Sequence, residues 1–415
     1  MPLPRKIEEI IKKGVRITDP FSIEIGDEVN PERISGQDVV LCQGTRIYGA
    51  HTLISAGAKI GFEGPATIID CQLGPFVELK GGFFQSSVFL ERASIASGAH
   101  IREGSLLEEE TKAGHTVGLK QTILFPFVTL GSLINFCDCL MAGGTGRENH
   151  SEVGSSYVHF NYTPQQDKAT ASLIGDVPRG VMLDQPPVFL GGQGGLVGPL
   201  RIDFGTVITA GTVWRHDSSG TKVLHGSDVR PRSQEYNAGA YGDIRRKVTN
   251  NVMYIANLRA LEQWYEQVRF PFFRKRELGE ELLAASLQLL TAALQERLKQ
   301  FRSCAEKMHK SAAIDRERVG RETDLSYRQR ELADKWTEIE DCLQAPLEEE
   351  VILRGRDSFL EMFLKQGSGG NDYLAAIRGL EGDAKRAGTC WLQGIVDCLA
   401  ERVRRVLPSF SAYLT

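Results

Sequence analysis

Residues 95–107 read IASGAHIREGSLL, and the apolar side chains of Ile95, Ile101 and Leu107 stand six residues apart. An interval of six is typical of a triangular coil in which each side is a short strand and one apolar side chain per side points to the axis. The interval returns later in the chain at Leu196, Ile202, Ile208 and Trp214. These hexapeptide repeats predict a left-handed parallel β-helix.

An aliphatic residue followed by glycine recurs through the same part of the chain, and such pairs suit the corners of a coil because glycine permits tight turns. Examples are Ile60-Gly61, Val117-Gly118 and Leu190-Gly191. Two segments break the six-residue interval, residues 143–150 and residues 178–187. We expect both to loop out of the coil, where sites are often built.

Glycine also marks a boundary, because most of the 43 glycines lie before about residue 245. Beyond it, apolar residues recur at three- and four-residue steps, as in Ile255, Leu258 and Leu261, which is the spacing of amphipathic helices. Helical patterns cover residues 255–268, 282–301, 324–344, 356–365, 371–381 and 384–406.

We therefore expect three parts in the chain. An N-terminal helix and lead-in occupies residues 1–19, the β-helix residues 20–235, and an α-helical domain residues 236–415. The helical domain is expected either to pack on the coil or to direct oligomerisation.

The 415 residues carry a formal net charge of −4 and eight scattered cysteines. This charge gives no general attraction to nucleic acid or to anionic lipid. No apolar run approaches the roughly 20 residues that span a bilayer, and no secretory signal opens the chain. We expect a cytoplasmic protein with reduced thiols, and neither nucleic acid nor membrane among its partners.

The segment from Gly154 to Asp176 reads GSSYVHFNYTPQQDKATASLIGD. It contains an Asn-Tyr pair, then a loop with a lysine, then an Ile-Gly-Asp corner. In this order of features it resembles the acetyltransferase domain of the bifunctional N-acetylglucosamine-1-phosphate uridyltransferase/glucosamine-1-phosphate acetyltransferase. The resemblance is specific over about residues 112–215, and the chain shows no counterpart of that family's nucleotidyltransferase domain.

The resemblance implies roles for particular residues. Asn161 and Tyr162 would hold a sugar phosphate, and Lys168 would meet its phosphate by charge-assisted hydrogen bonds. Gly192 and Ala210 would lie along an acetyl-CoA groove between the subunits of a homotrimer. The implied activity is acetyl-CoA-dependent N-acetylation of an amino sugar phosphate or a sugar nucleotide, as in the UDP-N-acetylglucosamine pathway.

The catalytic base of this family is a histidine in a Lys-Ala-Gly-His motif, which residues 112–115 reproduce. His115 lies one or more coils farther from Asn161 than the family's base does. An alignment without a gap places Asp138 at the base position instead. If the His115 match is accidental, His150 or His159 would serve, so three kinds of candidate stay open.

Upstream basic residues that bind the phosphate in that family are replaced by acidic ones at Glu103, Glu108, Glu109 and Glu110. Such groups would repel a sugar phosphate, and Arg102 would compensate only in part.

Two other classes of function compete with the acyltransferase. A zinc enzyme like the γ-carbonic anhydrases would draw on His115, His150 and His159 from neighbouring subunits, although the last pair is spaced too widely for that family. A non-catalytic scaffold or sugar-nucleotide-binding protein would need no base at all. We expect an acyltransferase without a bound metal ahead of both.

Overall fold

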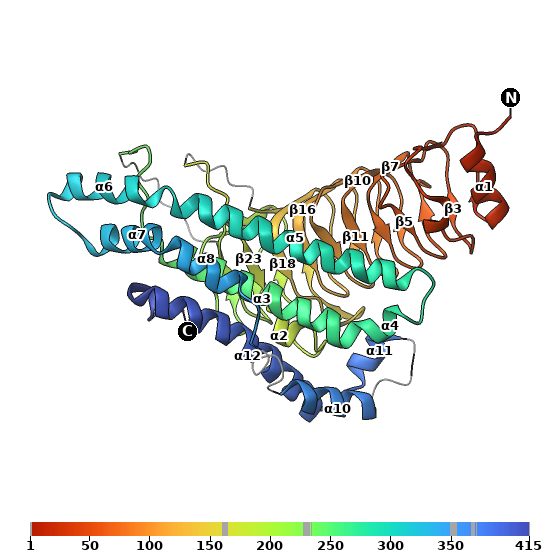
Figure 1. The fold of residues 1–415 in the computed structure, drawn as a ribbon. Coiled ribbons are helices and arrows are strands. Elements are labelled where there is room, and N and C mark those ends of the chain that lie inside the picture. The colour runs from red at the N-terminus through yellow and green to blue at the C-terminus, as the bar shows by residue number, and fades with distance from the viewer. Residues whose placement is uncertain are drawn as a thin grey trace.

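The computed structural model describes residues 2–159, 165–226, 233, 235–348, 355–366, 370 and 372–414. Short parallel strands wind into a β-helix, and long helices lie along one side of it (Figure 1). The predicted fold class, a parallel β-helix followed by an α-helical region, is confirmed.

The first face of the β-helix is an eleven-stranded parallel sheet with one strand from each turn. In order along the axis its strands are β1 (Arg16–Ile17), β3 (Val40–Leu41), β6 (Lys59–Ile60), β9 (Glu78–Leu79), β12 (Ser94–Ile95), β15 (Lys112–Ala113), β17 (Thr129–Leu130), β21 (Glu152–Val153), β24 (Phe189–Leu190), β27 (Val207–Ile208) and β29 (Val223–Leu224).

The second face is built from β2 (Glu24–Ile25), β4 (Arg46–Tyr48), β7 (Ala66–Ile69), β10 (Gly82–Gln85), β13 (Ala99–Ile101), β16 (Val117–Leu124), β18 (Ile134–Met141), β22 (Ser156–Val158), β25 (Gly194–Leu196) and β28 (Val213–Trp214). Strands β16 and β18 continue around the corner into the third face. That face also contains β5 (Leu53–Ile54), β8 (Gln72–Leu73), β11 (Ser87–Phe89), β14 (Ser105–Leu107), β23 (Ser172–Ile174) and β26 (Arg201–Ile202).

The six-residue interval places one inward side chain on each face. Ile95 belongs to the first face, Ile101 to the second and Leu107 to the third, and all three side chains are fully buried. The N-terminal helix α1 (Arg5–Lys13) adds Ile7 and Ile10 to the same core, so it closes the first turn of the coil.

Both segments that interrupt the repeat leave the coil. Strands β19 (Gly144–Gly146) and β20 (Asn149–His150) pair as an antiparallel hairpin, and the short helix α2 (Val177–Gly180) follows β23.

The helical region runs through α3 (Arg245–Trp264), the π-helical turn η2 (Tyr265–Arg269), α4 (Phe270–Phe273), α5 (Gly279–Ala305), α6 (Met308–Val319), α7 (Asp324–Asp334), α8 (Trp336–Gln344), α10 (Arg356–Gln366), α11 (Tyr373–Arg378) and α12 (Gly382–Val406). Short 3₁₀ turns lie at η1 (Pro31–Arg33) and η3 (Pro408–Phe410). Of the helices in the described part of the chain, none has the length and apolar surface that a bilayer-spanning segment needs.

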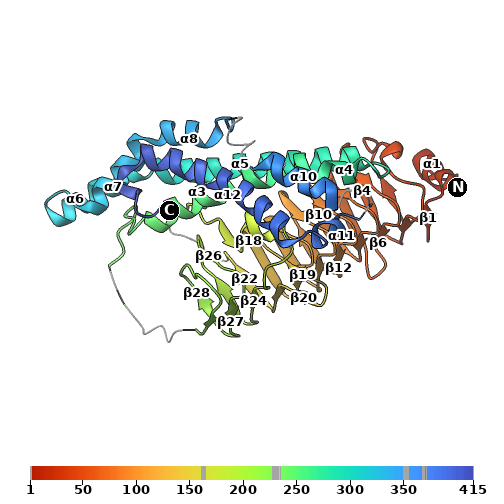
Figure 2. The same cartoon turned by 90° about the horizontal axis from the view of Figure 1, so that it is seen from below.

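The helices cover the third face and leave the strands of the first face on the opposite side (Figure 2). They do so because the outward side chains of the third face are apolar. Helix α5 packs on β8, β11 and β14, and α3 packs on β23. The outward ladder, called the docking ladder below, consists of Val88, Leu106, Ile123, Leu140 and Leu173, all buried. Burying each such side chain contributes about 1.5–3 kcal/mol.

Candidate functional site

The strand register brings residues from five turns into one column at the corner between the first and second faces. Ala113 pairs with Leu130, Leu130 with Val153, Val153 with Leu190, and Leu190 with Ile208. The residue two positions after each of these turns the corner. The resulting corner column consists of His115, Ser132, Ser155, Gly192 and Ala210.

Direct contacts tie the corner column together. His115 Nδ1 lies 2.7 Å from Ser132 Oγ, within hydrogen-bonding distance, and the His115 carbonyl accepts from the backbone N–H of Leu133 at 3.1 Å. Farther along, the Gly192 carbonyl accepts from the N–H of Gly211 at 2.8 Å. The His115 ring is exposed, so it can reach a bound molecule.

Backbone packing explains why small residues dominate the far half of this corner. A Cβ atom on Gly154 would stand 2.6 Å from the Gly192 nitrogen, and one on Gly191 would stand 2.4 Å from the Ala210 nitrogen. Both distances are shorter than real Cβ contacts allow. The turns therefore stack closely here, and neither Gly154 nor Gly191 has room for a side chain.

A cavity of about 380 Å³ opens on the second face beside the corner column. Its polar lining comes from His100, Arg102, Thr116, Asn135 and Tyr157. Arg102 is half-buried in this lining, one turn before His115. The arrangement places a cation and several hydrogen-bonding groups next to an exposed histidine.

Asp138 and His159 lie at the other corner, between the second and third faces. Asp138 Oδ1 forms an ion pair with Arg297 of α5 at 2.8 Å, and the Thr170 hydroxyl lies 3.3 Å from Oδ2. His159 Nε2 lies 2.7 Å from the Ser172 hydroxyl. Burial lowers the pKa of His159 to about 4, so its ring is neutral above pH 5.

Lys168 also belongs to this second corner, because it precedes β23 of the third face. Its side chain is exposed, whereas its neighbours Asp167 and Ala169 are buried. The predicted substrate residues Asn161 and Tyr162 lie outside the described residues.

The acidic residues that seemed unfavourable for a phosphate have partners of their own. Glu103 forms an ion pair with Lys120 at 2.6 Å. Glu108 and Glu109 are buried against the helical region, where both face Arg269 of η2. Neither Glu103, Glu108, Glu109 nor Glu110 lines the cavity beside His115.

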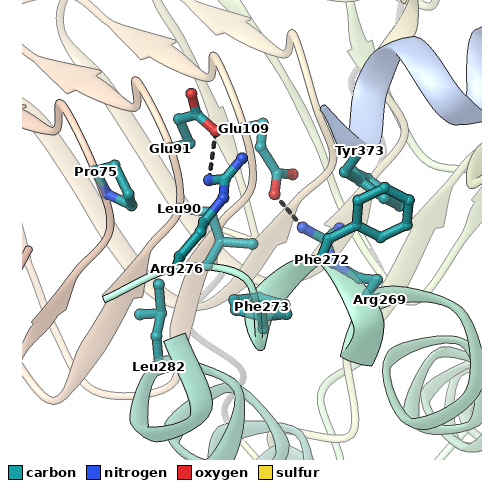
Figure 3. Close-up of a pocket in the computed structure, with 10 residues that line it drawn as sticks. All are labelled: Pro75, Leu90, Glu91, Glu109, Arg269, Phe272, Phe273, Arg276, Leu282 and Tyr373. Atoms are coloured by element: carbon teal, nitrogen blue, oxygen red, sulfur yellow. Dashed lines mark hydrogen bonds and ion pairs between the residues drawn. The ribbon is translucent and has the colours of Figure 1, made fainter. Parts of the chain in front are cut away.

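Figure 3 shows the surroundings of this buried charge. The Arg269 guanidinium reaches Glu109 between the rings of Phe273 and Tyr373, and Arg276 pairs with Glu91 at 2.5 Å. The Tyr265 hydroxyl donates to Glu108 Oε1 at 2.6 Å. One guanidinium serves two buried carboxylates, and burial raises the pKa of Glu108 to about 7.

The structure thus sorts the predicted residues into two groups. His115, Gly192 and Ala210 share the corner column, with Arg102 on the adjoining face, while Asp138, His159 and Lys168 share the second corner. Ser132 was missed by sequence reasoning. It could have been found by writing the repeats one below another, since it follows Leu130-Gly131 as His115 follows Ala113-Gly114.

Among the described residues, no three His, Cys, Asp or Glu side chains gather closely enough to hold a metal ion. His115 and His159 lie at different corners and share no site within one chain.

The fold and the corner column define a hexapeptide-repeat β-helix protein. Its curated relatives are bifunctional GlmU proteins: that of Thermotoga petrophila is 29% identical over 214 residues, covering 51% of this chain and 42% of the relative. The protein of Corynebacterium aurimucosum is 30% identical over 213 residues, covering 51% and 39%. The resemblance to this bifunctional family, inferred from motifs, is confirmed. The chain spans less than half the length of these relatives.

No protein-family model matches the chain. Among solved structures, the UDP-N-acetylglucosamine acyltransferase from Campylobacter jejuni aligns with a TM-score of 0.19 at 14% identity, covering 49% of this chain and 66% of that one. The Arabidopsis UDP-N-acetylglucosamine acyltransferase aligns with a TM-score of 0.20 at 11% identity, covering 68% and 90%.

Proposed function

We propose that this protein is an acetyl-CoA-dependent N-acetyltransferase that acts on an amino sugar phosphate or a sugar nucleotide. The observation that supports the proposal best is the corner column. It joins the exposed His115 to Gly192 and Ala210, the positions assigned to acetyl-CoA, through turns that are similar in sequence to the bifunctional GlmU proteins.

In the proposed reaction His115 is the general base. With Nδ1 donating to Ser132, the Nε2 lone pair accepts a proton from the acceptor amine while the nitrogen attacks the thioester carbonyl. The new C–N bond forms and the C–S bond breaks. The protonated His115 then gives its proton to the departing thiolate, so that coenzyme A leaves as a free thiol. Asp138 and His159 are proposed to hold the second corner, because the first is committed to Arg297 and the second is buried.

His115 and Lys168 lie at different corners, and this separation supports a homotrimer. A site that uses both residues is formed most simply when the second corner of one copy meets the corner column of the next. In this arrangement Arg102, Asn161, Tyr162 and Lys168 bind the acceptor, and Gly192 and Ala210 line the path of acetyl-CoA.

The proposal is tested by following free thiol with acetyl-CoA and a panel of amino sugar phosphates and amino sugar nucleotides. His115→Asn is expected to lower kcat by about 10²–10⁴-fold, the usual contribution of a general base. The matched control is His51→Asn, an exposed histidine on a distant turn, which is expected to keep full activity. Equal activity in both variants would remove His115 from the mechanism.

Mixing two inactive variants tests the shared site. His115→Asn and Lys168→Met, refolded together, are expected to regain part of the activity because some interfaces then carry both intact residues. No recovery from mixed assemblies would mean that each site belongs to one chain.

A further inference from the structure

The segment from Gln165 to Ala171 connects the second corner to β23 and carries Lys168. Gln166 in this segment has a left-handed backbone conformation, with a φ of 54°. The segment forms hydrogen bonds with three separate parts of the helical region.

Lys307, just before α6, holds the start of the segment. Its ammonium group donates to the carbonyls of Gln165 at 2.9 Å and Gln166 at 3.1 Å. The Gln165 amide closes a second link, since it donates to the Ala240 carbonyl at 2.9 Å and accepts from the Gly239 N–H at 3.0 Å.

Helix α3 holds the middle of the segment. The Lys247 ammonium lies 2.7 and 2.9 Å from the two carboxylate oxygens of Asp167, whose side chain is 1% exposed. One turn along the helix, the Asn251 amide donates to the Ala169 carbonyl at 3.1 Å.

These anchors determine where Lys168 points. Asp167 and Ala169 are buried against the helices, and Lys168 between them is exposed. Because the two neighbours are held against the helices, the exposed lysine side chain is left on the solvent side of the segment. The entropy of ordering this backbone is then lost on folding and not on substrate binding.

We propose that the helical region is a clamp that positions Lys168 for the anionic group of the acceptor, with Lys247, Asn251 and Lys307 as positioning residues. The inference rests on the proposed function for the role of Lys168. It assigns the helical region a part in acceptor binding and none in acetyl-CoA binding.

The experiment compares Lys307→Met with Lys299→Met in the 415-residue chain. Lys307 is bonded to backbone carbonyls, whereas Lys299 is a lysine on α5 with a side chain that is 75% exposed. Hydrogen exchange of residues 165–171 and the two KM values are measured for each variant. In Lys307→Met we expect exchange and the acceptor KM to rise about tenfold, the loss of about one charge-assisted bond. The KM for acetyl-CoA should stay within about twofold.

A second pair of variants, at Lys247, distinguishes loss of the clamp from general misfolding. Lys247→Met removes the ion pair of the buried Asp167 with α3 and is expected to weaken the clamp strongly. Lys247→Arg retains a cation at this position and is expected to restore the acceptor KM.

Each result has a defined meaning. Unchanged exchange in Lys307→Met and Lys247→Met overturns the clamp. Faster exchange with an unchanged acceptor KM, or an equal rise in both KM values, overturns the positioning role. Absence of any thiol release by the wild-type protein overturns the proposed function and the positioning role with it, whereas the exchange data still decide whether the clamp exists.

Discussion

The hydrogen bond between His115 and Ser132 joins two neighbouring turns through single side chains. The sequence identified His115 through its motif but left its distance from Asn161 unexplained. Residues 113 and 153 are two turns apart in the structure, and the hairpin of β19 and β20 lengthens the second turn. The number of residues between two positions therefore does not give the number of β-helix turns between them. Only the strand register shows that His115 shares a column with Gly192 and Ala210.

The buried Glu108 is expected to make the free energy of unfolding depend on pH. Burial raises the pKa of Glu108 from its ordinary value of 4.5 to about 7, so the folded protein holds this proton more tightly than the unfolded chain. The associated stability is complete below about pH 4.5 and is lost as the pH rises through 7.

Glu108→Gln mimics the protonated side chain and keeps the acceptor oxygen for Tyr265. We expect the free energy of unfolding of this variant, relative to wild type, to increase by roughly 3 kcal/mol from pH 4.5 to pH 8. Urea unfolding across this range measures the difference. A constant difference would show that Glu108 is ionised throughout.

Two adjacent glycines at the end of β24 are expected to differ in their roles, Gly191 in stability and Gly192 in binding of acetyl-CoA. A methyl group on Gly191 would clash with the Ala210 backbone at 2.4 Å, whereas one on Gly192 would meet its nearest atom, the Ser155 nitrogen, at 3.5 Å. Gly191→Ala is expected to lower the free energy of unfolding by about 1–3 kcal/mol.

Gly192→Ala is expected to fold with near wild-type stability and to raise the KM for acetyl-CoA about tenfold, because its methyl group would stand in the proposed path of the cofactor. Thermal unfolding and steady-state kinetics measure both effects. A wild-type KM in Gly192→Ala would place the cofactor elsewhere.

The helices were largely predictable element by element. The pattern over 384–406 corresponds to α12, and that over 282–301 to most of α5. The pattern over 324–344 is divided into α7 and α8 at Lys335. Because no glycine or proline marks this break, the spacing of apolar residues predicted one continuous helix across it.

The packing of the two regions against each other decides the shape of the whole molecule. The inward repeat predicted the coil but not which face the helices cover. A signal was present in neighbouring apolar pairs, such as Leu106-Leu107 and Leu140-Met141, where one side chain points inward and the other outward. Sequence spacing could not show that these outward residues align, because alignment depends on register.

Because the docking ladder is buried beneath the helices, substitutions in it are expected to destabilise the fold more than substitutions on the exposed first face. Leu140→Ala, beneath the helices, is expected to lower the free energy of unfolding by about 2–5 kcal/mol. Its control is Val207→Ala on the first face, which is 38% exposed and should change stability by no more than about 0.5 kcal/mol. Equal effects would mean that the helices are not docked on the third face.

The central claim is tested most directly by calorimetric titration of the 415-residue chain with acetyl-CoA and with coenzyme A, followed by addition of amine acceptors and detection of free thiol. Binding in the micromolar range and thiol release that depends on His115 are the predicted results. No binding up to millimolar concentration would contradict the acyltransferase and would favour a non-catalytic scaffold.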